Sequence, residues 1–238
     1  MQHIPDAPPA AADFVTGAIA SITRLIRDKD MKPGDRLPAE AKLSEQLQVS
    51  RTVVREALRS LAALRLVDLG AGKRPTIAEL DNASMALTIE HGVVTDQIDI
   101  QQIYDVRRTI EARTATLAAL RRTELEAQLI LGHAQAMEQA FGDPVAIMEH
   151  DLAFHAAIAR ASRNPVFALI IGAFQGVTRQ TWPIGWKSRA DDDERRAMNV
   201  LHVALAQAIV DGDPEASARL MNRHFDQSIK ALLTAGLI

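Results

Sequence analysis

Apolar residues recur at helical spacing along most of the chain. Residues 14–26 predict a first amphipathic helix that stops before Lys32-Pro33-Gly34. Two shorter helices are expected next, one over about 39–47 and one that begins after Ser50, a good N-cap residue. The segments 66–69 and 76–78 predict two short strands around a flexible basic loop. Together these elements predict a winged helix-turn-helix domain over residues 13–79, preceded by a flexible tail at 1–12.

From residue 80 to residue 238 the period is helical almost throughout. Asp143-Pro144, Asn164-Pro165 and Asp213-Pro214 each place a capping side chain before a proline, which is typical of a helix start. The expected helices cover 82–91, 100–120, 122–140, 144–161, 165–182, 192–211 and 214–235. The predicted fold class is therefore mainly α, with an all-α bundle of six or seven helices after the winged domain.

The amino-acid composition limits which kinds of site the chain can form. The chain of 238 residues has no cysteine, which excludes disulfides, thiolate zinc sites and cysteine nucleophiles. Any metal must be bound by His, Asp or Glu. No segment approaches 18 uninterrupted apolar residues, and no secretory signal is visible at the N-terminus. We therefore expect a soluble cytoplasmic protein with no membrane partner.

Charge is unevenly distributed along the chain. Residues 1–78 carry 12 Lys and Arg against 9 Asp and Glu, whereas the remainder carries 15 against 21. Within 50–74 the balance is six basic to two acidic residues. This distribution is typical of a segment that faces nucleic acid, although a solvated helix surface has the same composition.

The start of the third helix has side chains suited to reading DNA. In a helix-turn-helix, the first residues of the second helix of the motif enter the major groove. Ser50, Arg51, Thr52 and Arg55 stand at these positions, and the two arginines share one helix face. Arginine binds guanine edges, and hydroxyl groups reach phosphates or bases. Surface ion pairs on an exposed helix remain the alternative.

These segments resemble the GntR family of bacterial transcription regulators. The resemblance covers about residues 14–78 and rests on Gly34-Asp35-Arg36-Leu37-Pro38-Ala39-Glu40, Leu43-Ser44-Glu45 and Val49-Ser50-Arg51-Thr52-Val53-Val54-Arg55-Glu56-Ala57-Leu58. It implies contacts to double-stranded operator DNA from Ser50, Arg51, Thr52, Arg55 and Gly72, and the basic residues Arg36 and Lys73 are further candidates. Ala41 departs from the basic residue that many members have there, and Lys42 is a possible replacement.

A second group of residues suggests a metal site. Asp151 and His155 are four residues apart and share a helix face. His202 precedes the Gly212-Asp213 turn by about 11 residues and His224 follows it by about 11. If the two helices pack antiparallel, these histidines lie side by side, each about 16 Å from the turn at about 1.5 Å per residue. Buried polar residues that satisfy one another are the alternative, and His3, His91, His133 and His150 have no partner at a useful spacing.

Three imidazoles and one carboxylate suit a divalent ion, with zinc first and nickel, manganese or iron as alternatives. The later segments resemble the FadR-type subfamily with its C-terminal FCD domain, which implies that Asp151, His155, His202 and His224 are its four metal ligands. Leu201 departs from a frequent acidic residue. The segment 104–111 resembles the start of the same domain and implies that Arg107 binds an anionic effector, with an Arg107–Glu111 surface pair as the alternative.

The expected function is a homodimeric, metabolite-responsive transcription regulator, acting as a repressor. Its effector would be a small carboxylate, such as a hydroxy or sugar acid, bound next to the metal. One alternative is that the metal itself is the signal. The other is a metal-dependent hydrolase with Glu149 or His150 as the base, which leaves the Ser50–Leu58 motif unexplained.

Overall fold

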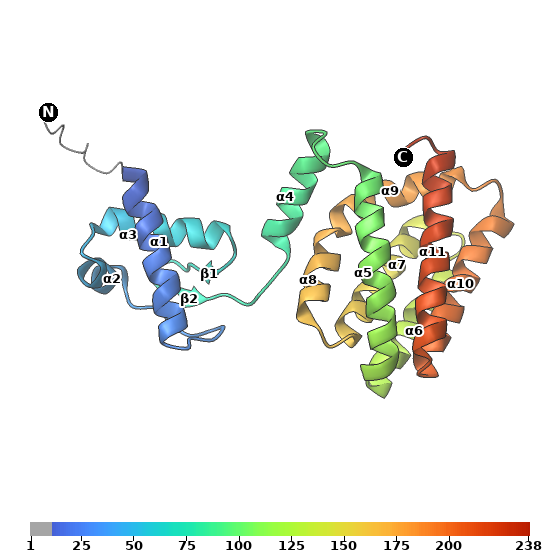
Figure 1. Ribbon diagram of the computed structural model, residues 1–238, viewed down its shortest axis with the longest axis horizontal. Coiled ribbons are helices and arrows are strands. Elements are labelled where there is room, and N and C mark those ends of the chain that lie inside the picture. Colours follow the sequence, from blue (N-terminus) through green and yellow to red (C-terminus); the bar gives the residue numbers. More distant parts are fainter. Residues whose placement is uncertain (1–10) are drawn as a thin grey trace, which may run out of the picture. The chain divides into compact units, whose positions relative to one another are not determined.

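The computed structural model describes residues 11–238 and confirms the predicted fold class (Figure 1). The chain forms two compact units that divide after Ser84, five residues beyond the predicted boundary at 79. Of the predicted tail, residues 1–10 lie outside the described residues, and residues 11 and 12 belong to the first helix.

The first unit is a three-helix domain with a small hairpin. Its elements are α1 (Ala11–Asp28), α2 (Glu40–Leu47), α3 (Arg51–Ala63), β1 (Val67–Asp68) and β2 (Thr76–Ile77). The strands pair antiparallel, with Val67 opposite Ile77 and Asp68 opposite Thr76. Both strands are shorter than expected, but the helix-turn-helix and its wing are present as predicted.

Aliphatic side chains hold the first unit together. Leu37, Leu43, Val54, Leu58 and Leu61 are buried in one cluster, to which α1 contributes Ala18 and Ile22. These positions recur at helical spacing, so each helix turns one apolar face inward. The opposite face of α3 is left in solvent, and that face carries the candidate DNA-reading residues.

The second unit continues from Met85 and is all helical. Its helices are α4 (Ala83–Val94, which starts just before the division), α5 (Ile100–Arg121), α6 (Glu124–Gln139), α7 (Pro144–Ala161), α8 (Pro165–Ala173), α9 (Gln175–Ser188), α10 (Asp192–Val210) and α11 (Pro214–Thr234). The three predicted starts are confirmed, because Asp143, Asn164 and Asp213 each accept a backbone hydrogen bond from the first turn.

The single helix expected over 165–182 is wrong. The chain breaks at Phe174 into α8 and α9, so eight helices lie between Ala83 and Thr234. Phe174 keeps near-helical backbone angles and buries its ring against Ile103 and Val177, so the apolar period runs through the break. The expected end at 182 is also wrong, because α9 accommodates Pro183 and continues to Ser188.

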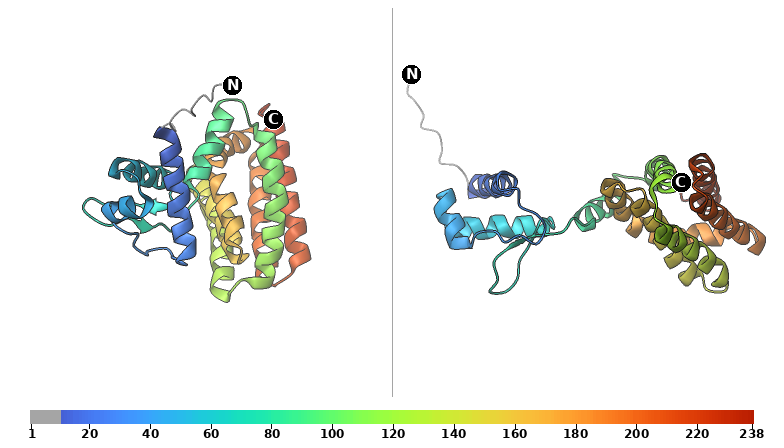
Figure 2. Two further views of the ribbon diagram at one scale, coloured as in Figure 1. Left: turned by 60° about the vertical axis from the view of Figure 1, so that its left-hand side comes forward. Right: turned by 90° about the horizontal axis from the view of Figure 1, so that it is seen from below.

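Within the second unit, α5 and α11 run side by side, and α10 packs against both α6 and α11 (Figures 1 and 2). The buried cluster between these helices and α7 includes Ile130, Phe154, Leu205 and Phe225. The candidate metal ligands lie on the inward faces of α7, α10 and α11. Among the described residues, no helix is long and apolar enough to cross a membrane.

Candidate functional site

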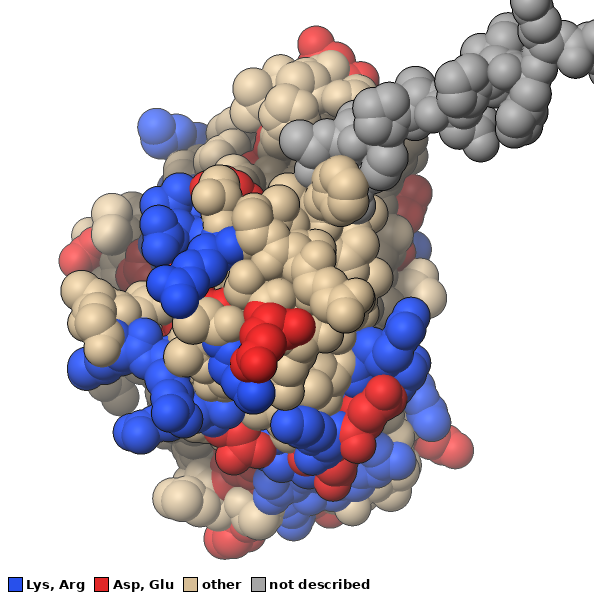
Figure 3. All heavy atoms as spheres, turned by 90° about the vertical axis from the view of Figure 1, so that its left-hand side faces the viewer, with Lys and Arg blue, Asp and Glu red and all other residues tan. Residues whose placement is uncertain are grey.

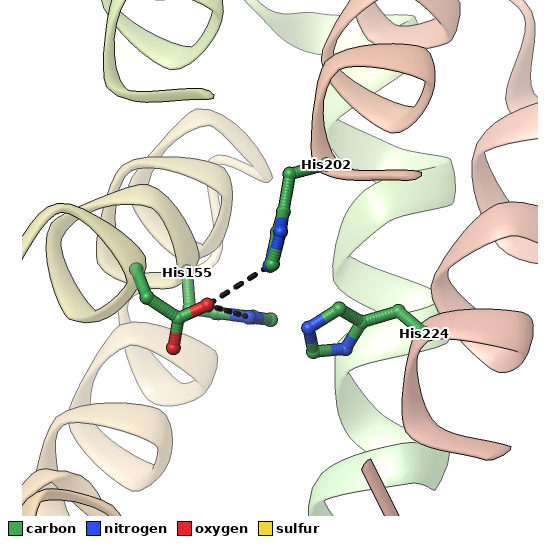
Figure 4. A group of neighbouring side chains, drawn as sticks. His155, His202 and His224 are labelled. Carbon is green, nitrogen blue, oxygen red and sulfur yellow. Dashed lines mark ion pairs between the residues drawn. The ribbon is translucent and has the colours of Figure 1, made fainter. Parts of the chain in front are cut away.

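Four side chains from three helices converge in the core of the second unit. His155 from α7, His202 from α10 and His224 from α11 turn their rings toward one another (Figure 4). Asp151, one turn before His155, completes the group, and one possible ligand atom from each residue lies within 4.8 Å of the others. The rings of His202 and His224 are 4.6 Å apart between centroids, so the helices flanking the Gly212 turn bring them together as expected.

Four of the six imidazole nitrogens of this group are buried without a hydrogen-bond partner. Nε2 of His155, both ring nitrogens of His202 and Nδ1 of His224 are buried and unsatisfied. Nε2 of His202 lies 2.9 Å from Oδ1 of Asp151 but forms no hydrogen bond with it. Because unsatisfied buried polar atoms are costly, one such nitrogen from each of the three rings, close to the Asp151 carboxylate, fits a bound cation. Neutral imidazole and carboxylate ligands suit zinc and similar divalent ions.

Glu111 on α5 supports the group from outside. Its Oε2 contacts Nδ1 of His155, and its Oε1 accepts a 2.8 Å hydrogen bond from Nε of Arg107. A carboxylate only accepts, so Nδ1 of His155 carries the proton and Nε2 is left to face Asp151 and the other histidines. The alternative of an Arg107–Glu111 pair on the surface does not hold, because Arg107 is 5% exposed and Glu111 is 1% exposed.

Electrostatics within the group favour a charged Asp151 carboxylate and a neutral His224. Burial alone would raise the pKa of Asp151, but His202 and the other two histidines outweigh it and hold that pKa well below its ordinary value. Burial and the neighbouring histidines lower the pKa of His224. An ionised carboxylate and a neutral imidazole are the protonation states in which these residues bind a metal.

A small cavity opens beside the group. It measures about 40 Å³, and its lining includes Asp151, His202, His224 and Arg107. Nη1 of Arg107 donates to Oγ1 of Thr178 at 2.9 Å, while Glu111 holds Nε of the same guanidinium. Arg107 therefore lies beside the candidate ligands, whereas the contact of Glu111 with His155 and that of Arg107 with Thr178 were not expected from the sequence. The signal for Glu111 was present, since it lies four residues after Arg107 on one helix face.

The candidate DNA-reading residues gather at the N-terminus of α3 in the first unit. Oγ of Ser50 accepts a 3.3 Å hydrogen bond from the Val53 amide and caps the helix as predicted. Arg51, Thr52 and Arg55 are exposed. Arg55 binds Glu40 of α2 through two nitrogens, with 2.8 Å between Nη2 and Oε2, so the alternative of a surface ion pair holds for this residue in the DNA-free protein.

The wing and the segment that precedes α2 carry further basic side chains of the first unit. Gly72 has a φ of +67°, which a side chain would strain, and Lys73 beside it is exposed. Arg36 is exposed and lines a hollow of about 500 Å³, which is also lined by Lys42, the possible replacement for the basic residue missing at Ala41, and by Lys29 and Arg74, which the sequence did not single out. Figure 3, which faces this unit, shows Lys and Arg in several patches with Asp and Glu between them.

One expectation about histidine is wrong, and the alternative of a hydrolase loses its candidate bases. His133 and His150 do have a partner, because their Nδ1 atoms lie 3.4 Å apart across α6 and α7. Glu149 pairs with Arg179 on the surface. Glu149 and His150 are therefore engaged outside the His–Asp group, and neither is placed to act as the base of a hydrolase there.

A winged helix-turn-helix joined to a helical domain with a small cavity defines a DNA-binding transcription regulator. The family model described as "Bacterial regulatory proteins, gntR family" matches residues 15–76, and the FCD domain model matches residues 102–227, more than half of the chain. The chain therefore belongs to the GntR family, in the FadR-type group with a C-terminal FCD domain. Members of this family are regulators that bind operator DNA, not enzymes.

The similar proteins include both a transcriptional activator and a transcriptional repressor. The chain is 31% identical to the HTH-type transcriptional regulator LutR of Bacillus subtilis over 157 residues, 66% of this chain and 72% of LutR. It is 31% identical to the Glc operon transcriptional activator of Escherichia coli over 63% of this chain and 61% of that protein. It is 30% identical to the galactonate operon transcriptional repressor of Escherichia coli over 79% of this chain and 84% of that protein.

A solved structure has the same fold. Streptococcus agalactiae GntR matches with a TM-score of 0.64 and 24% identity, over 90% of this chain and 97% of that one. At this identity the likeness concerns the arrangement of the helices and strands, so the chemistry of the site rests on this chain's own residues.

Proposed function

We propose that this regulator is a metabolite-responsive repressor whose operator binding is controlled by a small carboxylic acid bound beside a divalent metal ion. Asp151, His155, His202 and His224 would hold the ion, for which zinc is the first choice and nickel, manganese and iron are alternatives. When bound, the ion supplies a coordination position for an oxygen of the acid. Hydroxy acids and sugar acids carry a second oxygen close to the carboxylate and fit this role.

The observation that carries the proposal is the convergence of unsatisfied buried nitrogens on one point. A cluster that had evolved only for packing would satisfy its polar atoms internally. Here the one imidazole nitrogen that is satisfied, Nδ1 of His155, is held by Glu111 on the side away from the other three ligands. That arrangement is typical of metal-binding histidines, whose second nitrogen donates to a carboxylate.

Arg107 supports an acidic effector. Its guanidinium lines the same cavity as the candidate ligands, and planar guanidinium groups bind carboxylates through two parallel hydrogen bonds. One relative is named for the galactonate operon, and galactonate is a sugar acid. We extend this ligand class to the present chain because a carboxylate with an adjacent hydroxyl suits both Arg107 and a metal ion.

The first unit supports operator recognition, for which we propose a homodimer. Arg51, Thr52 and Arg55 project from the start of α3, which is the end that a recognition helix inserts into the major groove. Two such helices read a palindromic operator when they are spaced about 34 Å apart, one turn of DNA. Acid binding in the second unit would change that spacing and release the operator. Relatives include an activator and a repressor, and we propose that this regulator is a repressor.

Metal content and operator response test the proposal together. The duplex would be selected from random-sequence DNA by the purified protein and then used in gel-shift titrations. We expect about one divalent ion per chain. At a free concentration about 100 times its Kd, the ion should raise Tm by roughly 5 to 10 °C. Glycolate, lactate, gluconate and galactonate would be screened for release of the duplex.

Matched variants separate the roles of the residues. His155→Ala should lose metal, thermal stabilisation and the acid response, whereas His133→Ala, outside the cluster, should keep all three. Arg107→Lys keeps a charge beside Glu111 but loses the planar fork, so it should weaken acid binding and keep the metal. No metal uptake after incubation with zinc, nickel or manganese contradicts the metal centre. Release by metal alone would identify the metal as the signal.

A further inference from the structure

Arg189 lies between two cavities of the second unit. The inner cavity, of about 40 Å³, contains the candidate metal ligands in its lining. A neighbouring outer cavity, of about 260 Å³, is lined by polar residues that include Ser188, Gln227 and Lys230. Arg189 and Ala231 line both cavities, so the two adjoin at this arginine. A ligand that reached from the His–Asp group into the outer cavity would pass the Arg189 guanidinium.

The charge of Arg189 has no counterion in the part of the chain that the structure describes. Its Nη1 donates to the carbonyl of Gly185 at 3.0 Å, and no carboxylate of the described residues lies within ion-pair distance. Arg107, in the same inner cavity, is instead paired with Glu111 at 2.8 Å. Burial lowers the pKa of Arg189, whereas Asp151 and Glu194 act on it only from a distance. A half-buried guanidinium without a counterion favours an anion from outside.

The backbone at Arg189 is fixed in place. Arg189 is the C-cap residue of α9, and its carbonyl accepts a 3.1 Å hydrogen bond from Nη2 of Arg195. The preceding hydroxyl, Oγ of Ser188, donates to the carbonyl of Ala231 on α11 at 2.7 Å. These contacts tie the end of α9 to its neighbours, so the guanidinium is held at the junction of the two cavities before any ligand arrives.

The volumes limit how a ligand can be placed. A water molecule needs roughly 10–15 Å³ of such space, so the inner cavity holds about three waters. That space accommodates a carboxylate and an adjacent hydroxyl, and the rest of the ligand must extend past Arg189. The outer cavity is large enough for that remainder. Its lining contains a second cation, Lys230, and one carboxylate of opposite charge, Glu194.

The charges around the inner cavity set the charge of the ligand. Arg107 and Glu111 neutralise each other, and a divalent ion with Asp151 leaves one positive charge. Arg189 adds a second. We propose that the effector is a hydroxy acid with two carboxylates, one beside the His–Asp group and Arg107 and the other on Arg189. This inference rests on the proposed function, which it narrows from carboxylic acids in general to dianions.

Matched pairs of acids test the number of carboxylates directly. Tartronate and malate are glycolate and lactate with one added carboxylate, and galactarate is galactonate with its terminal CH2OH group oxidised to a carboxylate. Calorimetry on the metal-loaded protein should show that at least one dianion binds roughly 10- to 100-fold more tightly than its matched monoanion, the gain expected from one charge-assisted contact. Arg189→Gln should remove that gain and leave the monoanion affinity within about twofold.

Two further variants separate a contact from a structural effect. Arg189→Lys keeps the charge and should recover part of the gain, whereas Lys187→Gln removes a nearby exposed cation on α9 and should change nothing. Equal binding within every pair, or an equal loss for both acids in Arg189→Gln, would overturn the role of Arg189 while the carboxylate sensor stands. If none of the six acids binds, the proposed function fails as well.

Discussion

Two arginine–glutamate pairs of the same length lie in opposite surroundings in the two units. Arg55 and Glu40 in the first unit are 2.8 Å apart, with side chains 53% and 36% exposed. Arg107 and Glu111 in the second unit are also 2.8 Å apart, with side chains 6% and 1% exposed. In water an exchange of partners costs little, whereas in the core each charge depends on the other. Equal distances therefore do not mean equal roles.

The exposed pair is suited to exchange. Exposed ion pairs contribute about 0–1 kcal/mol, so Arg55 can leave Glu40 for a base or a phosphate at little cost. Glu40 also keeps the guanidinium ordered across α2 and α3 in the DNA-free protein. The buried pair is instead committed to the fold, since Glu111 holds both Arg107 and the ring of His155. The exposed arginine of the first unit is thus available to a ligand, whereas the buried arginine of the second unit is held by its carboxylate partner.

Breaking the buried pair should give the largest effect. Glu111→Ala leaves the Arg107 guanidinium buried without its partner and removes the contact to Nδ1 of His155. We expect a loss of about 3–5 kcal/mol in the free energy of unfolding, measured by urea denaturation of the metal-free protein. Metal affinity should fall in addition, because the His155 ring loses its orienting carboxylate.

The matched control is another arginine–glutamate pair of the second unit. Glu149→Ala breaks the pair with Arg179, whose two side chains are 50% and 49% exposed, and should cost at most about 1 kcal/mol. If both variants lose the same stability, burial does not distinguish the two pairs and the contrast between the units is wrong.

Sequence reasoning was most successful where a feature is local. The cap at Ser50 and the proline-led starts of α7, α8 and α11 depend on a few neighbouring residues, and the structure has them all. The pairing of His202 with His224 was also predictable, because one turn between two antiparallel helices fixes which residues face each other. These predictions needed no knowledge of distant segments.

The parts that sequence reasoning missed depend on packing between distant segments. The break at Phe174 is invisible in the apolar period, because both α8 and α9 are apolar toward the core. Arg107 and Glu111 have the spacing of a surface pair, and only the burial of α5 against α11 excludes that alternative. Arg189 has no motif around it, and its position emerges only where two cavities meet.

The next largest effect concerns the exposed face. Arg51→Ala and Arg55→Ala should each weaken binding to a selected operator duplex by about 1–3 kcal/mol, since each removes one contact to a base or a phosphate. Stability should change by less than about 0.5 kcal/mol, because both side chains are exposed. Gel-shift titration at fixed salt, together with urea denaturation, measures the two quantities.

Arg59→Ala on the same helix is the control, because it removes an exposed arginine that pairs with Glu56 farther from the helix start. It should leave operator specificity unchanged. Weakening by Arg59→Ala equal to that by Arg51→Ala would indicate that α3 contributes general positive charge rather than specific contacts. Unchanged operator binding in both Arg51→Ala and Arg55→Ala would remove α3 as the recognition helix.

The smallest expected effect tests whether the stability of the first unit also depends on a local hydrogen bond. Ser50→Ala removes the hydroxyl that accepts from the Val53 amide, and loss of an N-cap costs about 1 kcal/mol. Ser50→Asn keeps a capping oxygen and should recover most of that stability in urea denaturation. If Ser50 also contacts the operator, Asn will restore the helix but not the DNA affinity. An alanine variant as stable as the parent would show that packing of Val54 and Leu58 alone holds the start of α3.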